Sequence, residues 1–177
     1  MQSLKSNKQA ERLSISKREK KVLDTLSSLD IPFERTEHPP VFTVEEAKKH
    51  WSGLPGAHCK NLFLRNKKGS RHYLLIIEQS KNTDIKALAH LLGEDRLSFA
   101  SGERLMRYLG LETGAVSPFG LINDVMNEVK VLIDGDLRST ALIYFHPNVN
   151  TATLGLSFPD FERFLDFAGN PVRFIAV

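Results

Sequence analysis

The sequence predicts a single α+β domain with a mixed central β-sheet of about six or seven strands flanked by helices. Its 177 residues, 41% hydrophobic and 25% charged, suit one globular domain with a sizeable core. Segments of alternating or continuous apolar residues are interleaved with segments of helical spacing. The two types do not follow the regular strand–helix alternation of a doubly wound parallel sheet, which favours a mixed sheet.

The N-terminal third predicts helical and extended segments. In residues 18–30 apolar side chains recur at helical spacing, and a proline stops the helix shortly afterwards. Two prolines require extended backbone at 38–42. Thr43 and Glu46 have the spacing of a capping box, which predicts a short helix there. Glycines and a proline predict a loop at 52–58.

The rest of the chain predicts most of the sheet. Gly69 supplies the backbone freedom for a turn between the first two strands. Gly93 and Gly110 end two helices, and Ser157 is the expected N-cap of a third. The expected strands cover residues 61–66, 72–78, 96–100, 128–135, 141–147, 152–157 and 171–177. The expected helices cover residues 84–92, 102–109 and 157–169.

We expect a basic N-terminal extension, residues 1–15, followed by a domain that covers residues 16–177. Residues 1–21 carry seven basic and two acidic side chains, although the net charge of the whole chain is only +3. A basic arm of this kind can attract a polyanion. A solvated terminal helix without a partner explains the same pattern.

Composition excludes several classes of protein. One cysteine, Cys59, allows neither a disulfide framework nor a thiolate metal cluster. The sequence has no apolar run of about 20 residues and no secretory signal, so we expect a cytoplasmic protein without a membrane partner. The histidines lack metal-ligand spacing, and no phosphate-binding or serine-nucleophile motif occurs, so we expect no cofactor and no metal.

Three polar features remain unexplained by fold alone. Lys60 and Asn61 open an apolar strand, although lysine and asparagine are poor strand residues. The segment 113–120, TGAVSPFG, packs two glycines and a proline and could present backbone groups to a ligand. His146 ends a strand in YFHPN. Each feature also has a plain reading: a solvated lysine, an ordinary turn and a structural histidine.

These features occur together with EHPPVFTVEEA, GAHCKNLFL, LSFASGERL, LGLETGAVSPFGLINDV and FHPN. In this order and at these spacings they resemble the free-standing prolyl-tRNA editing proteins of the YbaK/ProX family, and most closely the alanyl-tRNA(Pro) deacylase branch. The resemblance runs from about Phe33 to the C-terminus. It implies a metal-independent deacylase that hydrolyses mischarged Ala-tRNA(Pro), with aminoacyl-tRNA as substrate and prolyl-tRNA synthetase as a candidate partner.

The resemblance also implies roles for individual residues. Lys60 is expected to bind the 3′-terminal adenosine, the loop that begins at Gly114 to position the ester, and His146 to form hydrogen bonds or move protons. These three are the expected catalytic residues. A positioned water, a polarised carbonyl and the ribose 2′-hydroxyl can hydrolyse so labile an ester. The expected substrate-binding residues are Val41, Phe42, Asn61, Phe63, Ser117 and Pro118, of which Val41, Phe42 and Phe63 equally suit plain core packing.

Size explains why such an enzyme is needed. A pocket built for proline cannot fully reject alanine, since a methylene or two is worth only about 1–3 kcal/mol. Three alternatives stay open on the sequence: a deacylase for mischarged Cys, Ser or Thr, a non-catalytic tRNA- or synthetase-binding module of the same fold, and an interaction protein whose basic tail docks on a synthetase or on RNA.

Overall fold

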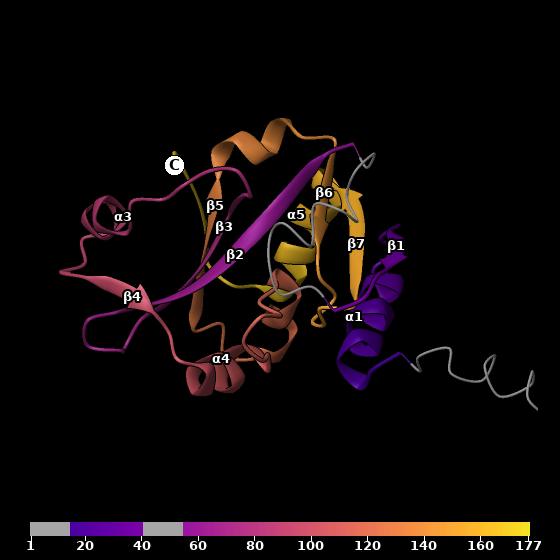
Figure 1. Cartoon of the computed structure of the whole chain (residues 1–177), viewed down its shortest axis with the longest axis horizontal. Helices are drawn as coiled ribbons and strands as arrows, with labels where there is room; N and C mark the ends of the chain where they lie inside the picture. The colour runs from indigo at the N-terminus through magenta and orange to yellow at the C-terminus, as the bar shows by residue number, and fades with distance from the viewer. Residues whose placement is uncertain (1–14, 41–54) are drawn as a thin grey trace, which may run out of the picture.

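The computed structural model describes residues 15–40 and 55–177, which form one mixed β-sheet and its surrounding helices (Figure 1). Seven strands follow one another in the order β1-β7-β6-β2-β3-β5-β8, and β4 pairs with β2. The strands are β1 (Glu34–Glu37), β2 (Ala57–Asn66), β3 (His72–Glu78), β4 (Leu97–Phe99), β5 (Val129–Asp134), β6 (Leu142–Phe145), β7 (Ala152–Ser157) and β8 (Val172–Ile175). The helices are α1 (Lys17–Ser28), α3 (Ile85–Leu91), α4 (Gly102–Leu109) and α5 (Phe158–Ala168), with the 3-10 helices η1 (Pro118–Asn123) and η2 (Gly135–Ser139).

The predicted fold class is confirmed, and all seven expected strands are present. The eighth strand, β1, was not expected because its sequence, ERTE, is polar throughout, as suits an edge strand. The end of the predicted 52–58 loop is wrong: Ala57 and His58 already belong to β2, because they pair with Ile143 and Tyr144 of β6. The short helix expected after Thr43 lies outside the described residues.

Local signals set the helix ends as predicted. The Ser157 hydroxyl accepts a hydrogen bond from the backbone of Asp160 and caps α5. Gly110 ends α4 with φ of 65°, a conformation that glycine adopts without strain. At the other end of the chain Ser16 caps α1. The division into an extension of residues 1–15 and a domain from residue 16 stays a prediction.

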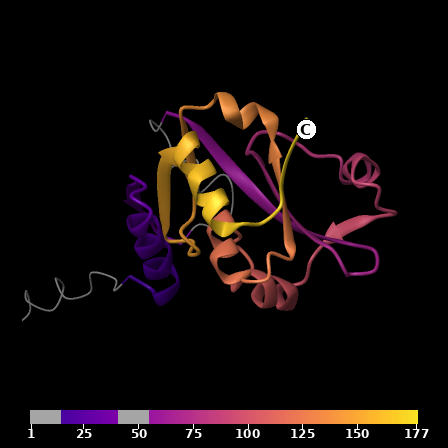
Figure 2. The same ribbon diagram turned by 180° about the vertical axis from the view of Figure 1, so that it is seen from behind.

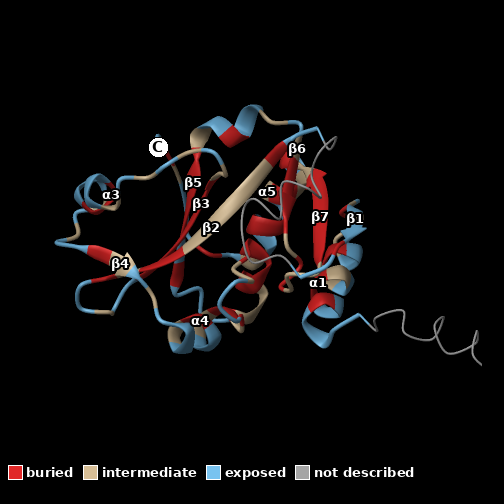
Figure 3. Ribbon diagram, in the orientation of Figure 1, coloured by how far each residue is buried: buried red, intermediate tan, exposed pale blue. Residues whose placement is uncertain are grey.

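Two apolar clusters cover opposite faces of the sheet. The main core combines inward residues of α1, α4, η1 and α5, among them Leu26, Leu109 and Phe161, with those of the strands. Figure 2 shows α5 in front of the sheet on this side. A smaller cluster lies on the other face, where Leu88 and Ala89 of α3 pack on β2, β3 and β5. Burial is greatest in β3, β5, β6 and β7, whereas residues 58–62 of β2 are only half-buried (Figure 3).

Part of strand β2 has a neighbouring strand on one side only among the described residues. It pairs with β3 over seven residues, but with β6 only at Ala57 and His58. Its pairing with β4 begins at Leu64. Within the described part of the chain, residues 59–63 of β2 therefore have a strand partner on one side only. The backbone gap between β2 and the end of β6 lies at this point.

Candidate functional site

The segment 113–118 is fastened across the gap between β2 and β6. The side-chain amide of Asn61 donates a 3.1 Å hydrogen bond to the carbonyl of Val116. The Ser117 hydroxyl donates a 2.6 Å hydrogen bond to the carbonyl of His146. One loop is thus joined to β2 on one side and to the strand end after β6 on the other, which brings three separate sequence motifs together.

Lys60 and His146 lie at the same level on the two sides of the gap. The last pair of the parallel β2–β6 ladder is His58 with Tyr144, and each of the two residues lies two positions beyond it. His58 and Tyr144 stack with ring centroids 4.5 Å apart, so their side chains share one face of the sheet. Because side chains alternate along a strand, Lys60 lies on the same face as His58.

We call this face, which carries His38, Thr153, Tyr144, His58 and Lys60, the site face. It lies opposite the main core, since the alternate residues of β6 and β7 enter that core. Lys60 is half-buried, and within residues 15–40 and 55–177 no carboxylate pairs with it. A half-buried ammonium group without a counter-charge is suited to an anionic ligand.

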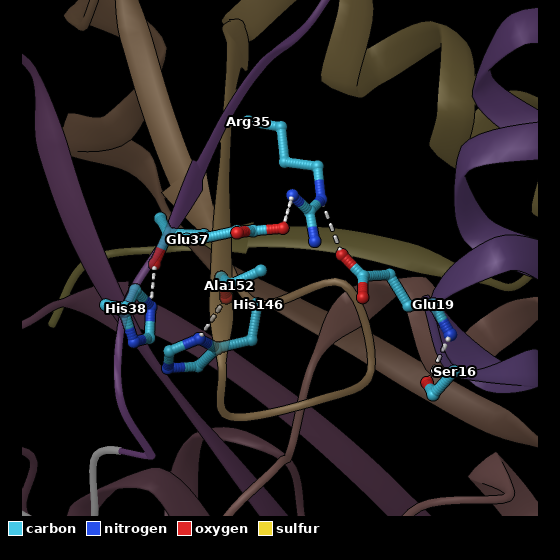
Figure 4. A network of polar contacts seen from close by, with 8 residues as sticks. Ser16, Glu19, Arg35, Glu37, His38, His146 and Ala152 are labelled. Atoms are coloured by element: carbon cyan, nitrogen blue, oxygen red, sulfur yellow. Dashed lines mark hydrogen bonds and ion pairs between the residues drawn. The ribbon is translucent and has the colours of Figure 1, made fainter. Parts of the chain in front are cut away.

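The imidazole of His146 is held in one orientation. Its Nδ1 lies 2.9 Å from the carbonyl oxygen of Ala152 on β7, which can only accept, so Nδ1 carries the proton (Figure 4). The other nitrogen, Nε2, forms no hydrogen bond with any described residue. Burial lowers the pKa of His146, and nearby His38 adds to this. The side chain is therefore neutral near pH 7 and offers Nε2 as an acceptor.

Asn148, in the same FHPN motif, forms a hydrogen bond with the segment that follows the loop. Its backbone has φ of 62°, and its side-chain amide donates to the carbonyl of Phe119 at 3.3 Å. Asparagine tolerates this left-handed conformation better than most residues. The motif therefore makes two contacts with segment 117–119, one through the carbonyl of His146 and one through Asn148.

The expected loop residues differ in exposure. Gly114 is exposed and has φ of 90°, and a Cβ placed there would meet nothing within 4 Å. Ser117 is 0% exposed, and Pro118 is also buried. The structure thus places Gly114 on the surface of the loop and Ser117 behind it, where the hydroxyl holds the backbone of His146.

The remaining expected residues do not all meet on one face. Asn61 follows Lys60 on β2, so the two side chains lie on opposite faces, and Asn61 supports the loop from the core side. Phe63 is 4% exposed and stacks on His72. Val41 and Phe42 lie outside the described residues. Burial raises the pKa of the Cys59 thiol, which makes it a poor nucleophile.

This arrangement suits binding and positioning of a substrate. It offers a cation, a neutral imidazole acceptor and a loop with exposed backbone, all beside one gap. Among the described residues, no three His, Cys, Asp or Glu side chains are placed to hold a metal ion. The helices of that same part of the chain are each too short or too polar to cross a bilayer.

Sequence reasoning missed His38 and Thr153. They lie next to His146 on the site face, and His38 Nε2 is 2.9 Å from the Thr153 hydroxyl. The two residues are 115 positions apart, so no local pattern could connect them. His38 stands in the EHPPVF motif, which is the one signal that could have drawn attention to it.

Comparison with known proteins gives a consistent result. The sequence model of the aminoacyl-tRNA editing domain family matches residues 38–164. The chain is 42% identical to "Prolyl-tRNA editing protein ProX" of Acetoanaerobium sticklandii over 154 residues, which cover 87% of this chain and 94% of that protein. It is 37% identical to "Prolyl-tRNA synthetase associated domain-containing protein 1" of Bos taurus over 149 residues, with coverages of 82% and 86%.

Solved structures share the fold. A crystal structure of a proposed trans-editing enzyme for prolyl tRNA synthetase superposes with a TM-score of 0.70, covering 93% of this chain and 99% of that one at 19% identity. The crystal structure of hypothetical protein APE2540 gives a TM-score of 0.67 at 20% identity, with coverages of 86% and 96%. At such low identity the likeness concerns the fold alone.

Proposed function

Since the chain belongs to the aminoacyl-tRNA editing domain family, we propose that it is a trans-editing deacylase that hydrolyses mischarged Ala-tRNA(Pro). The observation that carries the proposal is the 42% identity to a prolyl-tRNA editing protein over 94% of that protein's length. The geometry of the gap supports it, because Lys60, His146 and the 113–118 loop come together there. In this proposal residues 16–177 form the editing domain, and the protein works in the cytoplasm with prolyl-tRNA synthetase.

Lys60 supplies the charge that binds the 3′ end of the tRNA. The terminal adenosine carries a phosphate and ribose oxygens, and an unpaired ammonium beside apolar residues recognises such groups through charge-assisted hydrogen bonds. In this proposal Lys60 binds and orients the 3′ end and takes no part in proton transfer. Asn61 contributes from the opposite face by holding the loop.

His146 accepts a proton or a hydrogen bond during hydrolysis. Its Nδ1 is occupied by the carbonyl of Ala152, so only Nε2 can accept, either from the attacking water or from the ribose 2′-hydroxyl. Water attacks the ester carbonyl, the bond to the ribose oxygen breaks, and that oxygen takes up a proton as free alanine leaves. Gly114 lets the loop present backbone amides that polarise the carbonyl.

A small side-chain pocket gives the selectivity. We assign its wall to Val41 and Phe42, so that alanine enters and the proline ring is excluded, whereas Phe63 packs in the main core on the other face of β2. Steric exclusion achieves this more sharply than the loss of one or two methylene contacts could. Ser117, which is buried, acts indirectly by fixing the backbone of His146.

A deacylation panel tests the proposal. Purified protein is incubated with Ala-, Cys-, Ser-, Thr- and Pro-tRNA(Pro), and release of each amino acid is compared with spontaneous hydrolysis. Rapid release from Ala-tRNA(Pro) with Pro-tRNA(Pro) left intact is the expected result. Preferential release of Cys, Ser or Thr would assign the same chemistry to another error. Tight binding of all five esters without turnover would identify a non-catalytic module instead.

A further inference from the structure

The side chain of His38 is buried, and both of its ring nitrogens form hydrogen bonds. It follows β1 and is 8% exposed. Its Nδ1 lies 2.9 Å from the carbonyl oxygen of Pro39, which only accepts, so Nδ1 carries a proton. In the neutral ring Nε2 then accepts the 2.9 Å hydrogen bond from the Thr153 hydroxyl. Both ring nitrogens are therefore engaged, and the ring cannot turn over without losing both bonds.

His38 and His146 form hydrogen bonds with three consecutive residues, Thr151 to Thr153, at the start of β7. The backbone of His38 donates to the carbonyl of Thr151 at 3.0 Å, and its side chain bonds Thr153. Between these two lies Ala152, whose carbonyl orients His146. Anything that fixes 151–153 therefore also fixes the acceptor that determines the tautomer of His146.

The two rings are also in direct contact. Their centroids are 5.8 Å apart and their planes meet at 65°, an edge-to-face arrangement (Figure 4). In this position the His38 ring restricts the space into which the imidazole of His146 could flip. A flip would bring a carbon to the carbonyl of Ala152 and break the hydrogen bond made by Nδ1.

We propose that His38 is a positioning residue that, together with Thr153, holds His146 in the single orientation and tautomer that presents Nε2 to the substrate. The role rests on the proposed function, in which His146 serves ester hydrolysis. His38 itself does not touch the reacting atoms. Its action passes through the backbone of 151–153 and through the ring contact.

An ion pair fixes β1, the strand that precedes His38, to α1. Arg35 on β1 forms a 2.7 Å ion pair with Glu19 of α1, which is 3% exposed, and a second one of 2.6 Å with Glu37 (Figure 4). Charge-assisted bonds to a buried carboxylate are among the stronger polar contacts. The ion pair therefore anchors the strand that ends in His38.

Within residues 15–40 and 55–177, the ionisable groups on the site face include His38 at the end of β1, Tyr144 of β6, and His58 and Lys60 of β2. Strand β7, η1 and the 113–118 loop contain no ionisable side chain. Thr153→Val leaves all of these groups in place, so a change at His146 in that variant reports the lost Thr153 hydroxyl.

Nitrogen NMR of the imidazoles together with kinetics on Ala-tRNA(Pro) tests the proposal in the full-length protein. His38→Phe keeps a ring but loses both hydrogen bonds, while Thr153→Val removes one hydroxyl and keeps His38. Thr36→Val is the matched control, because Thr36 is exposed on β1 and pairs with Thr153 through the backbone. Valine and threonine side chains are similar in size, so we expect Thr153→Val to fold. The test can therefore be made with this variant even if His38→Phe does not fold.

We expect wild-type and Thr36→Val proteins to show neutral His146 as the Nδ1–H tautomer. In His38→Phe and Thr153→Val both tautomers should appear, and kcat should fall about 10- to 100-fold with little change in KM. An unchanged single tautomer in both folded variants overturns the proposal, whether or not kcat falls. The NMR result is independent of turnover, so it decides the matter even if the wild-type protein hydrolyses no ester and the proposed function fails.

Discussion

The hydroxyl of Ser117 donates a 2.6 Å hydrogen bond to the main-chain carbonyl of His146, across 29 positions of sequence. The Ser117 hydroxyl oxygen also accepts a hydrogen bond from the backbone amide of Phe119 at 3.2 Å. Ser117 thus caps η1 and holds the FHPN segment at once. Because the loop and His146 are joined by this hydroxyl, a substitution in one should shift the position of the other.

Ser117→Ala should weaken both stability and activity. A buried carbonyl loses its partner and η1 loses its cap, which together cost about 1–2 kcal/mol of unfolding free energy. Because His146 then moves relative to the loop, kcat should fall about tenfold or more. Ser101→Ala is the control, because it also removes a helix cap. The Ser101 hydroxyl caps α4 by accepting a hydrogen bond from the backbone amide of Arg104. Equal activities in the two variants would remove Ser117 from the positioning of His146.

Gly114→Ala should reduce hydrolysis through the backbone rather than through crowding. The added methyl group would meet no atom of the described residues within 4 Å. The cost comes from φ of 90°, which alanine adopts only with strain of about 1–3 kcal/mol. The loop should relax and misplace its backbone amides.

Gly93→Ala is the matched control for this change. Gly93 has φ of 67° with equally open surroundings, but it follows α3, away from the site. Similar losses of melting temperature with hydrolysis lost only in Gly114→Ala would support the assignment. Full activity of both variants would make the 113–118 loop a structural turn.

The pH dependence of hydrolysis should report His146. Burial lowers its pKa below the ordinary value of 6.5, and the neutral ring is the active form. On acidification kcat/KM should therefore fall with a midpoint below pH 6.5. In His146→Asn the remaining activity should lack this acidic limb. A decline centred above pH 6.5 in the wild-type protein would contradict a neutral, buried acceptor.

A second histidine should govern stability instead of activity. His72 is 1% exposed, lies 4.0 Å from the Tyr108 ring centroid and accepts a 3.0 Å hydrogen bond from Arg104. Burial, followed by the charge of Arg104, lowers its pKa from 6.5 to about 4. Between these two pH values the unfolded chain binds the proton and the folded one does not, so acidification favours unfolding.

The melting temperature should accordingly fall as the pH drops from 6.5 towards 4. His72→Phe keeps the stacked ring and removes the titrating group, so its melting temperature should fall less over the same range. The two proteins are compared by differential scanning calorimetry. Parallel pH profiles would show that His72 does not contribute to the acid sensitivity.

The sequence predicts the strands that carry apolar residues and the caps that end the helices. The apolar runs in β2 and β3, and the glycines after α3, α4 and α5, are local signals. Strand β1 has no such signal, because an exposed edge strand gains its stability from the backbone of β7. The start of β2 at Ala57 depends on pairing with β6, some 85 residues later in the chain.

The site is predicted less completely. The motifs make Lys60, the loop and His146 candidates for the site, but they do not show how these are joined. The faces of Lys60 and Asn61 follow from alternation only once the start of β2 is known. The bonds Ser117–His146 and His38–Thr153 connect distant segments through tertiary structure, so no spacing in the sequence could reveal them.

Release of alanine from Ala-tRNA(Pro) by wild-type protein and by Lys60→Ala tests the central claim most directly. Lys86→Ala, which removes an exposed lysine on α3, is the control. The wild-type and control proteins should release alanine far faster than spontaneous hydrolysis. Loss of one charge-assisted contact should slow Lys60→Ala about 10- to 100-fold at an unchanged melting temperature. No release by the wild-type protein, or equal release by Lys60→Ala, would contradict the assignment of this gap as a deacylase site.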